Sequence, residues 1–327
     1  MRPIALSRIM CSLGMLCVSY LSAFAAAGDY PSRPVKIIVQ AGPGNSPDVI
    51  GRLLAEQFAQ IWGQQVLVIN HVGAGGSIAA RAAVTAPADG YTLFMPATSI
   101  FVSMQELFPD LPFEVSRALT AVGFVGEQPL AIAVSPALGV NSLPELFALA
   151  NRRPNGIDYA ASPVGGLPHL TGAWLRSASG ANLNFVPYPG VAQAMGDILG
   201  GRIPMAIESL AVLKSVADAG YLKILAFAST ERLPNFPNVP TVAETLPGFV
   251  AIGWFALVAP TGTDEAIRAK LGQDLAKALA RPELQRKLAE VGGTYARPMS
   301  VGQTNEFIRS QQNLWQPVLR QLDLQPH

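Results

Sequence analysis

The sequence predicts an α/β fold with two domains, and three observations support this prediction. From Tyr30 onward, short runs of β-branched residues alternate with longer segments of helical periodicity. Half of the 327 residues are hydrophobic, enough to fill a core in each of two domains of ordinary size. Glycine-rich turns follow several of the strand-like runs. Strand–helix alternation of this kind predicts largely parallel sheets with helices on both faces.

The predicted strands are Val35–Gln40, Val66–Asn70, Tyr91–Met95, Leu130–Val134, Ile157–Ala161, Leu183–Tyr188, Met205–Ile207, Leu222–Ala228 and Gly253–Pro260. Between them, apolar residues recur on one helical face, first from Ile50 to Ile61 and later from Ile267 to Leu279. Glu127–Pro129 and Leu246–Gly248 are candidate crossings between the domains. The pattern leaves open whether the domains follow in series or the chain returns to the first one.

The N-terminus predicts export. Arg2 and Arg8 flank a short basic start, Ile9–Phe24 is almost wholly apolar, and small-residue cleavage sites follow up to Ala27. This order is typical of a secretory signal peptide, which we expect to span residues 1–27 and to be cleaved, leaving a periplasmic protein. The alternative is an uncleaved anchor, but the apolar run is shorter than the ~20 residues that span a membrane.

Composition excludes several classes of function. Cys11 and Cys17 both lie in the predicted signal peptide, so the mature chain would have no thiol for catalysis, disulfides or metal binding. His71, His169 and His327 are too scattered to predict a zinc site. Without the two arginines of the signal peptide, 21 basic residues face 22 acidic ones, so no nucleic-acid partner is expected.

The turn Gly42–Asp48 joins the first predicted strand to the first predicted helix. Ser46 is predicted to be the N-cap, Pro47 suits the first helical position, and Gly63 lies just beyond the end. Such a helix presents free N–H groups and the positive end of its dipole, which attract an anion without a basic side chain. The alternative for this turn alone is an ordinary strand–helix connection without a ligand.

Similar turns follow other predicted strands: Gly73–Ser77, Ser162–Gly166 and Tyr188–Gly190. Together they could line one cleft at the strand ends, where open α/β sheets bind ligands. None contains Lys or Arg, so an anion would be held by N–H groups, hydroxyls and water. A dinucleotide site is not favoured, because Ile78 stands where the third glycine of G-x-G-x-x-G is needed.

Catalytic patterns are sparse. The sequence has no G-x-S-x-G motif and no histidine with an evident carboxylate partner. Asp48 at a helix N-terminus more often caps or complements the dipole than acts as a base. His169 is interpreted first as a structural imidazole, Tyr188 as a half-buried aromatic, and Glu208 as either a cleft residue or a solvated strand end.

Ten motifs, in order and spacing, resemble the Bug receptors, the substrate-binding proteins of tripartite tricarboxylate transporters. They are Tyr30–Val39, Gly42–Asp48, Gly73–Gly76, Asp89–Leu93, Tyr159–Ser162, His169-Leu170, Val186–Tyr188, Asp197–Arg202, Asn238–Glu244 and Trp254–Pro260. The resemblance covers nearly all of the mature chain. It implies a periplasmic-binding-protein-like (Venus flytrap) fold, with residues 28–128 and 249–327 in domain 1 and residues 129–248 in domain 2.

The resemblance also implies a function: a small carboxylate is captured in the cleft between the domains, and the receptor delivers it to membrane transporter subunits or a sensor. The protein would be a monomer without catalytic residues, metal or cofactor; a periplasmic enzyme on a similar scaffold is the alternative. The expected ligand-binding residues are Pro43, Gly44, Asn45, Ser46, Asp48, Ser77, Thr98, Ser99, Ser162, Gly165, Gly166, His169, Tyr188 and Glu208. Asn45, Gly166 and Pro204 depart from residues common in the family, which affects the identity of the ligand.

Overall fold

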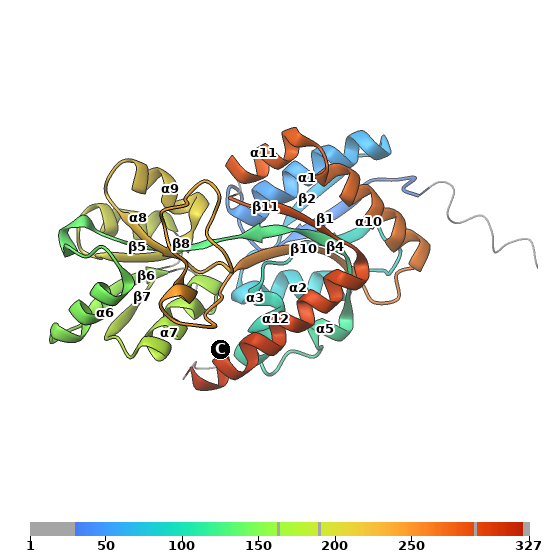
Figure 1. The fold of residues 1–327 in the computed structure, drawn as a ribbon. Coiled ribbons are helices and arrows are strands. Elements are labelled where there is room, and N and C mark those ends of the chain that lie inside the picture. The colour runs from blue at the N-terminus through green and yellow to red at the C-terminus, as the bar shows by residue number, and fades with distance from the viewer. Residues whose placement is uncertain (1–29, 162–163, 189–190, 291–292, 323–327) are drawn as a thin grey trace, which may run out of the picture.

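The computed structural model describes residues 30–161, 164–188, 191–290 and 293–322. Their strands form two sheets in two lobes that lie side by side (Figure 1). The predicted signal peptide lies outside the described residues. Within them, no helix is long and apolar enough to cross a membrane.

The first lobe contains a six-stranded sheet. In spatial order its strands are β11 (Tyr295–Met299), β4 (Leu119–Gln128), β10 (Gly253–Pro260), β3 (Thr92–Phe94), β1 (Val35–Val39) and β2 (Val66–Asn70). The strands therefore come from two separate parts of the chain, 35–128 and 253–299. Alternate residues of β1 enter different cores: Val35, Ile37 and Val39 face one side and Ile38 the other. This burial on both faces explains why the strand is apolar except at the exposed Lys36.

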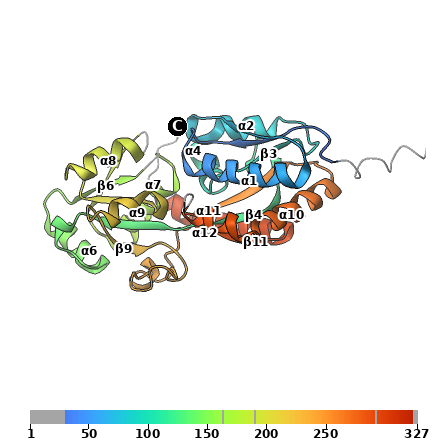
Figure 2. The same cartoon turned by 90° about the horizontal axis from the view of Figure 1, so that it is seen from above.

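Helices cover both faces of this sheet (Figure 2). On one face, α1 (Ser46–Trp62), α10 (Glu265–Leu279) and α11 (Pro282–Glu290) share a core with the sheet. On the other, α2 (Ser77–Val84) and α12 (Val301–Gln321) pack with the short helices α3 (Ser99–Val102), α4 (Met104–Leu107) and α5 (Val115–Ala118).

The second lobe contains a five-stranded sheet drawn from residues 130–227. Its strand order is β7 (Leu183–Pro187), β6 (Ile157–Ala161), β8 (Met205–Ser209), β5 (Leu130–Val134) and β9 (Lys223–Phe227). One face is covered by α6 (Leu143–Arg152) and α7 (Leu167–Ser179), and the other by α8 (Val191–Leu199) and α9 (Leu210–Asp218).

The prediction of largely parallel sheets is wrong in one respect, because both sheets are mixed. The order β2–β1–β3 and the order β7–β6–β8 are parallel, whereas β10 and β11 run antiparallel to β4, and β5 runs antiparallel to β8 and β9. The reason is the path of the chain. It enters the second lobe along β4 and returns along β10, so these two neighbours have opposite directions.

The entry into the second lobe is very short. Only Pro129 separates β4 from β5, and its carbonyl accepts a hydrogen bond from Leu210 N at 3.0 Å. Proline has no N–H for a strand ladder, which explains why one sheet stops there and the next begins. The return runs from β9 to β10 and includes a bond from Ala251 N to Ala228 O at 2.9 Å.

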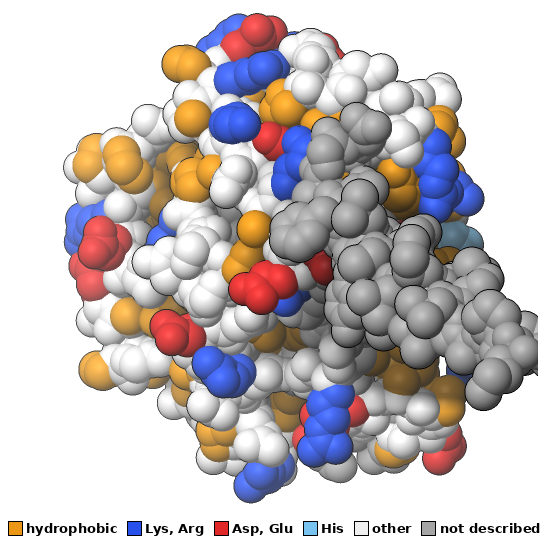
Figure 3. All heavy atoms as spheres, turned by 90° about the vertical axis from the view of Figure 1, so that its right-hand side faces the viewer, with side chains coloured by type: hydrophobic (Ala, Val, Ile, Leu, Met, Phe, Trp, Pro, Cys, Tyr) orange, Lys and Arg blue, Asp and Glu red, His pale blue; other side chains and the backbone are white. Residues whose placement is uncertain are grey.

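Charged side chains are mixed over the surface. Figure 3 shows the end of the first lobe, where the described residues carry basic and acidic side chains side by side, without a continuous basic area. On the second lobe, charged residues also form pairs one helical turn apart, such as Lys214 with Asp218. This distribution agrees with the balanced composition.

One buried carboxylate ties α10 to α1. Asp274 in α10 is 2% exposed and accepts hydrogen bonds from Trp62 Nε1 at 2.9 Å, Lys270 Nζ at 2.7 Å and Lys277 Nζ at 3.1 Å. Burial alone would raise the pKa of Asp274, but these three donors hold it below its usual value. The lowered pKa means that the native state favours the ionised carboxylate.

We expect Asp274→Asn to reduce the free energy of unfolding by about 1–2 kcal/mol at pH 7, because charge-assisted hydrogen bonds are lost. The loss is limited because Lys277, one of the two lysine partners, is largely exposed to solvent. The pKa of Asp274 is lower in the native state than in the unfolded chain. The stabilisation is therefore fully present above the unfolded-state pKa and is lost as the pH falls through the native-state pKa. The difference between wild type and variant should therefore shrink below about pH 4. Denaturant titration from pH 7 to pH 3 measures it.

Asp218→Asn is the matched control, because Asp218 also pairs with a lysine but is 60% exposed. It should change stability little at either pH. A loss in Asp274→Asn that persists unchanged at pH 3 would contradict the assignment to the ionised carboxylate.

Candidate functional site

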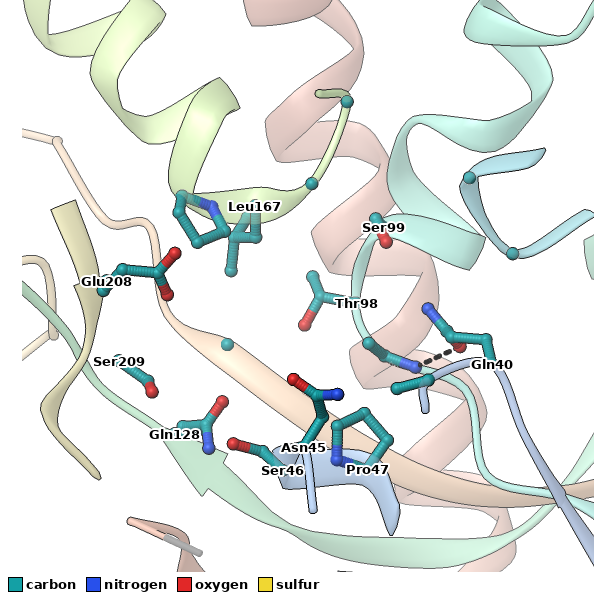
Figure 4. Close-up of a pocket in the computed structure, with 18 of the residues that line it drawn as sticks. Gln40, Asn45, Ser46, Pro47, Thr98, Ser99, Gln128, Leu167, Glu208 and Ser209 are labelled. Atoms are coloured by element: carbon teal, nitrogen blue, oxygen red, sulfur yellow. Dashed lines mark hydrogen bonds between the residues drawn. The ribbon is translucent and has the colours of Figure 1, made fainter. Parts of the chain in front are cut away.

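A cavity of about 1210 Å³ lies between the two lobes (Figure 4). Its wall in the first lobe comes from the β1–α1 loop, the glycine-rich turn after β2 and the start of α3. Its wall in the second lobe comes from the loop before α7, the end of β7 and the β8–α9 junction. The two crossing segments, at Gln128 and at Gly253–Phe255, close its base.

The β1–α1 loop brings the N-terminus of α1 to the cavity. The N-cap is Asn45, with extended backbone angles, and not Ser46 as the sequence predicted; Ser46 is the first helical residue. A hydroxyl is a common N-cap, but Asn45 takes the place and makes no side-chain capping bond. The first helical hydrogen bond runs from Val49 N to Asn45 O, so the N–H groups of Ser46 and Asp48 precede the helical ladder. The predicted end of this helix is confirmed, since Gly63 lies directly after α1 with φ 65°.

Asp48 holds this loop in shape. The residue is 2% exposed, and its carboxylate accepts from Gly44 N at 2.9 Å and from Asn70 Nδ2 at 2.8 Å. Arg52 Nε also donates to it at 3.0 Å. Burial by itself would raise the pKa of Asp48, but the bonds from Arg52, Gly44 and Asn70 keep it below its usual value. Asp48 thus stays ionised and acts on the loop instead of lining the cavity.

The loop before α7 is held in the same way. Gly165 N donates to His169 Nδ1 at 3.0 Å, and the imidazole packs against Phe185 in a tilted arrangement with 4.0 Å between ring centroids. Because Nδ1 accepts this bond, the ring in this state carries its proton on Nε2. The first helical bond of α7 runs from Leu170 N to Gly166 O, so the N–H groups of Leu167 and His169 precede the ladder.

The two loops therefore share one arrangement. In each, a glycine with positive φ donates its N–H to a side chain four residues later: Gly44 (φ 83°) to Asp48 and Gly165 (φ 76°) to His169. A proline occupies the position before that side chain in both helices. Positive φ suits glycine, which explains the residue type at these two places. The arrangement places two helix N-termini, one from each lobe, on the same cavity.

Several hydroxyl groups near the cavity already make hydrogen bonds to other groups of the protein. Thr98 Oγ1 accepts from Trp254 N at 2.8 Å and lies 3.1 Å from Trp254 O, so it joins α3 to β10. Tyr188 donates its hydroxyl to Asp197 at 2.5 Å, and partial burial together with this bond raises the pKa of Tyr188 to about 12. Ser103 Oγ donates to Gly165 O at 3.3 Å, which links the lobes on one side of the cleft.

The structure brings together most of the predicted ligand-binding residues. Those that line the cavity are Gly44, Asn45, Ser46, Thr98, Ser99, Gly165, Gly166, Tyr188 and Glu208. Four others, Pro43, Asp48, Ser77 and His169, are not among the lining residues. Ser162 lies outside the described residues, as do Pro189 and Gly190 of the fourth predicted turn.

The sequence reasoning missed several lining residues, among them Gln40, Ser103, Gln128 and Trp254. A signal existed for two of them. Gln128 belongs to a segment predicted as a crossing, and Trp254 follows the other crossing; crossings between lobes necessarily lie beside the cleft. Gln40 supports the site indirectly, since its Oε1 accepts from Ala97 N at 2.9 Å (Figure 4).

The wall of the cavity is nearly neutral. Among the described residues that line it there is no Lys, Arg or His, and Glu208 is the single residue with a formal charge. The described part of the chain also contains no group of three His, Cys, Asp or Glu side chains placed to hold a metal ion. The wall thus offers helix N-termini, amides and hydroxyls to a ligand, with an acid on the side of the second lobe.

Known proteins resemble this chain over nearly its whole length. Protein BugT of Bordetella pertussis is 35% identical over 97% of this chain and 98% of its own. Among solved structures, R. palustris Rpa4515 with adipate has a TM-score of 0.83 and 28% identity, covering 91% of this chain and 100% of that one. MatC from Rhodopseudomonas palustris with bound malate has a TM-score of 0.78 and 26% identity, covering 89% of this chain and 100% of that one.

The family match agrees with these similarities. Residues 50–324 match TctC, described as the tripartite tricarboxylate transporter family receptor. The matched region includes both sheets except β1, and nearly all of the cavity wall except the β1–α1 loop. By its sequence and by its fold, this chain belongs to the family of tripartite tricarboxylate transporter receptors.

Proposed function

We propose that this protein is a periplasmic receptor that binds a small carboxylate between its lobes and delivers it to a tripartite tricarboxylate transporter. One observation carries the proposal: two helix N-termini, at Ser46 and Leu167, face one cavity whose described wall has no basic side chain. The adipate and malate in the structures of two relatives support the choice of a carboxylate.

Backbone groups are sufficient to hold such an anion. The N–H groups of the first helical turn have no acceptor within the helix, and the helix dipole adds a partial positive charge. A hydrogen bond to a charged partner contributes ~1.5–3 kcal/mol, so a few converging N–H groups can replace a salt bridge. The pinned glycines Gly44 and Gly165 keep these donors oriented before the ligand arrives.

We further propose that residues 28–128 with 249–327 and residues 129–248 are the two rigid domains, which close on the ligand after cleavage of a signal peptide at residues 1–27. The two separate sheets and the single-residue crossing at Pro129 support these boundaries. Closure around a ligand is the usual response of clamp-like receptors, because the ligand favours the state in which both lobes contact it.

The same site gives no support to the alternative of an enzyme, and we infer that the receptor leaves its ligand unchanged. On the described wall the titratable side chains are Tyr188 and Glu208. Tyr188 donates its hydroxyl to Asp197, and its raised pKa keeps it protonated near pH 7, so no phenolate is present to act as a base. We also propose that the receptor acts as a monomer and that its partners are the membrane subunits of the transporter.

Native mass spectrometry of the protein as purified, followed by calorimetry with adipate and malate, tests the function. We expect a bound organic acid, or micromolar or tighter binding of an added one. X-ray scattering with and without that acid should show a smaller radius of gyration in the complex. A saturated complex with unchanged dimensions would contradict closure, and a crystal structure with Lys or Arg on the carboxylate would contradict the backbone site.

Ser46 permits a direct test of a backbone donor. Ser46→Ala removes the hydroxyl alone, whereas Ser46→Pro also removes the N–H. Proline suits the first helical position, and Asn45 already has the extended conformation that a following proline requires. We therefore expect Ser46→Pro to weaken carboxylate binding at least tenfold more than Ser46→Ala, a difference of about 1.4 kcal/mol.

Thermal melting first establishes that both Ser46 variants are folded. Calorimetry with the acid that binds the wild type then compares the two affinities. Equal affinities would show that the N–H of residue 46 does not contact the ligand.

His169 is expected to act through Gly165 and not by touching the ligand. His169→Ala leaves Gly165 N without its acceptor, so the loop should loosen and carboxylate binding should weaken severalfold. Hydrogen exchange over residues 164–170 should become faster in the unliganded variant. His71→Ala, at a histidine that does not line the cavity, is the control and should leave both unchanged. Weaker binding with unchanged exchange would instead indicate direct contact.

A further inference from the structure

Glu208 stands out on the cavity wall because it is the single charged side chain among the described lining residues. It is the fourth residue of β8, it is 8% exposed, and its carboxylate points into the pocket toward Leu167 at the start of α7 (Figure 4). An acid in this place needs an explanation in a cavity that otherwise offers donors to an anion.

The position of Glu208 is fixed by the sheet. β8 pairs with β6 on one side and with β5 on the other, and Glu208 is in register with Ala131. All five residues of β8 are buried. Two neutral polar residues of the wall, Gln128 and Ser209, lie on the same side of the pocket (Figure 4). Glu208 therefore belongs to a built wall and is not a solvated strand end.

The charge of Glu208 restricts what can lie beside it. Two carboxylates in a partly desolvated cavity repel each other, because the surroundings screen them less than water does. A hydroxyl or an ammonium group at the same place would instead donate a hydrogen bond to Glu208. An ionised carboxylate has about four acceptor sites, so it can accept from a ligand in addition to bonds within the protein.

We propose that the ligand is a carboxylate that also carries a hydrogen-bond donor, a hydroxyl or an ammonium group, and that Glu208 accepts from this donor. The inference rests on the proposed function, since the ligand carboxylate is assigned to the helix N-termini of α1 and α7. Glu208 thereby selects substituted acids over plain ones, and the two loops provide the general affinity for carboxylates.

Two matched series of acids test this with the wild-type protein alone. Succinate, malate and aspartate share four carbons and differ at one position by hydrogen, hydroxyl or ammonium. Adipate, 2-hydroxyadipate and 2-aminoadipate repeat the comparison with six carbons. In at least one series, calorimetry should give at least tenfold tighter binding for a substituted acid than for the plain one.

Glu208→Gln then assigns the preference to this side chain. The amide still accepts a hydrogen bond but has no charge, so an ammonium-bearing acid should lose at least tenfold in affinity and a hydroxyl-bearing acid about threefold. The plain acid should bind the variant as well as, or better than, the wild type. Glu231→Gln, the same change at an exposed glutamate that does not line the cavity, is the control and should keep the preference. If Glu208→Gln does not fold, Glu208→Asp serves instead, and the wild-type series stands without either.

The outcomes separate this inference from the proposed function. If plain and substituted acids bind the wild type equally, or if the preference survives in Glu208→Gln, the role of Glu208 is wrong while the carboxylate receptor stands. If the plain dicarboxylate binds best and weakens as the pH rises, Glu208 is protonated and donates to it, which also overturns the inference. If none of the six acids binds the folded protein and the purified protein retains no organic acid, the proposed function fails and the inference fails with it. If it retains an acid that has neither a hydroxyl nor an ammonium group, the inference alone fails.

Discussion

The site depends on one repeated hydrogen bond, from the N–H of a glycine with positive φ to a side chain four residues later. Gly44 makes this bond to Asp48 and Gly165 makes it to His169. Without it, each loop would have a flexible glycine two residues before the helix, and the residues that lead into the helix N-terminus would be held less firmly. With it, the donors in the first turns of α1 and α7 converge on the cavity from opposite lobes.

The two side chains that accept these bonds, Asp48 and His169, differ in chemistry although the geometry of the bonds is alike. Asp48 is itself held by Arg52 and Asn70, so the first loop is anchored to β2 and α1 through a charged network. His169 is held by packing against Phe185, and its loop also contacts the first lobe through Ser103. The first loop is thus fixed within its own lobe, whereas the second is fixed partly by a contact across the cleft. The part of the wall formed by the β1–α1 loop is therefore set within the first lobe, whereas the part formed by the loop before α7 depends on how the lobes meet.

Much of the fold was predictable from local pattern. The strands at Val66–Asn70, Leu130–Val134, Ile157–Ala161 and Gly253–Pro260 were predicted with their observed bounds, because each is a short, mostly apolar run between turn residues. β4 was missed, since Gly123 and Gly126 interrupt its apolar run. The structure explains the second glycine: a Cβ at Gly126 would lie 2.4 Å from Tyr295 O of β11, a close approach that no local pattern announces. β11 was missed as well, because it is half-exposed and contains Pro298.

The site was predictable where it consists of turns and unpredictable where it depends on tertiary contacts. The glycine-rich turns identified Gly44, Ser46, Gly165 and Gly166 by their residue types. Asp48 and His169 were expected beside these loops. Their hydrogen bonds with Gly44 and Gly165 could not be predicted, since the sequence does not show which way a side chain turns. The wall residues at Gln128 and Trp254 come from the crossings, and their place beside the cleft follows only from the arrangement of the lobes.

The crossing at Pro129 has a mechanical consequence. One residue between two buried strands leaves no slack, and the hydrogen bond from Leu210 N to Pro129 O holds that residue from the side of the second lobe. A joint of this kind keeps the two lobes from sliding apart. The other crossing, at Gly253–Phe255, also lies at the base of the cavity. A change in the angle between the lobes would therefore act mainly on the mouth of the cavity, and the length of a ligand that touches both walls would limit how far the lobes can close.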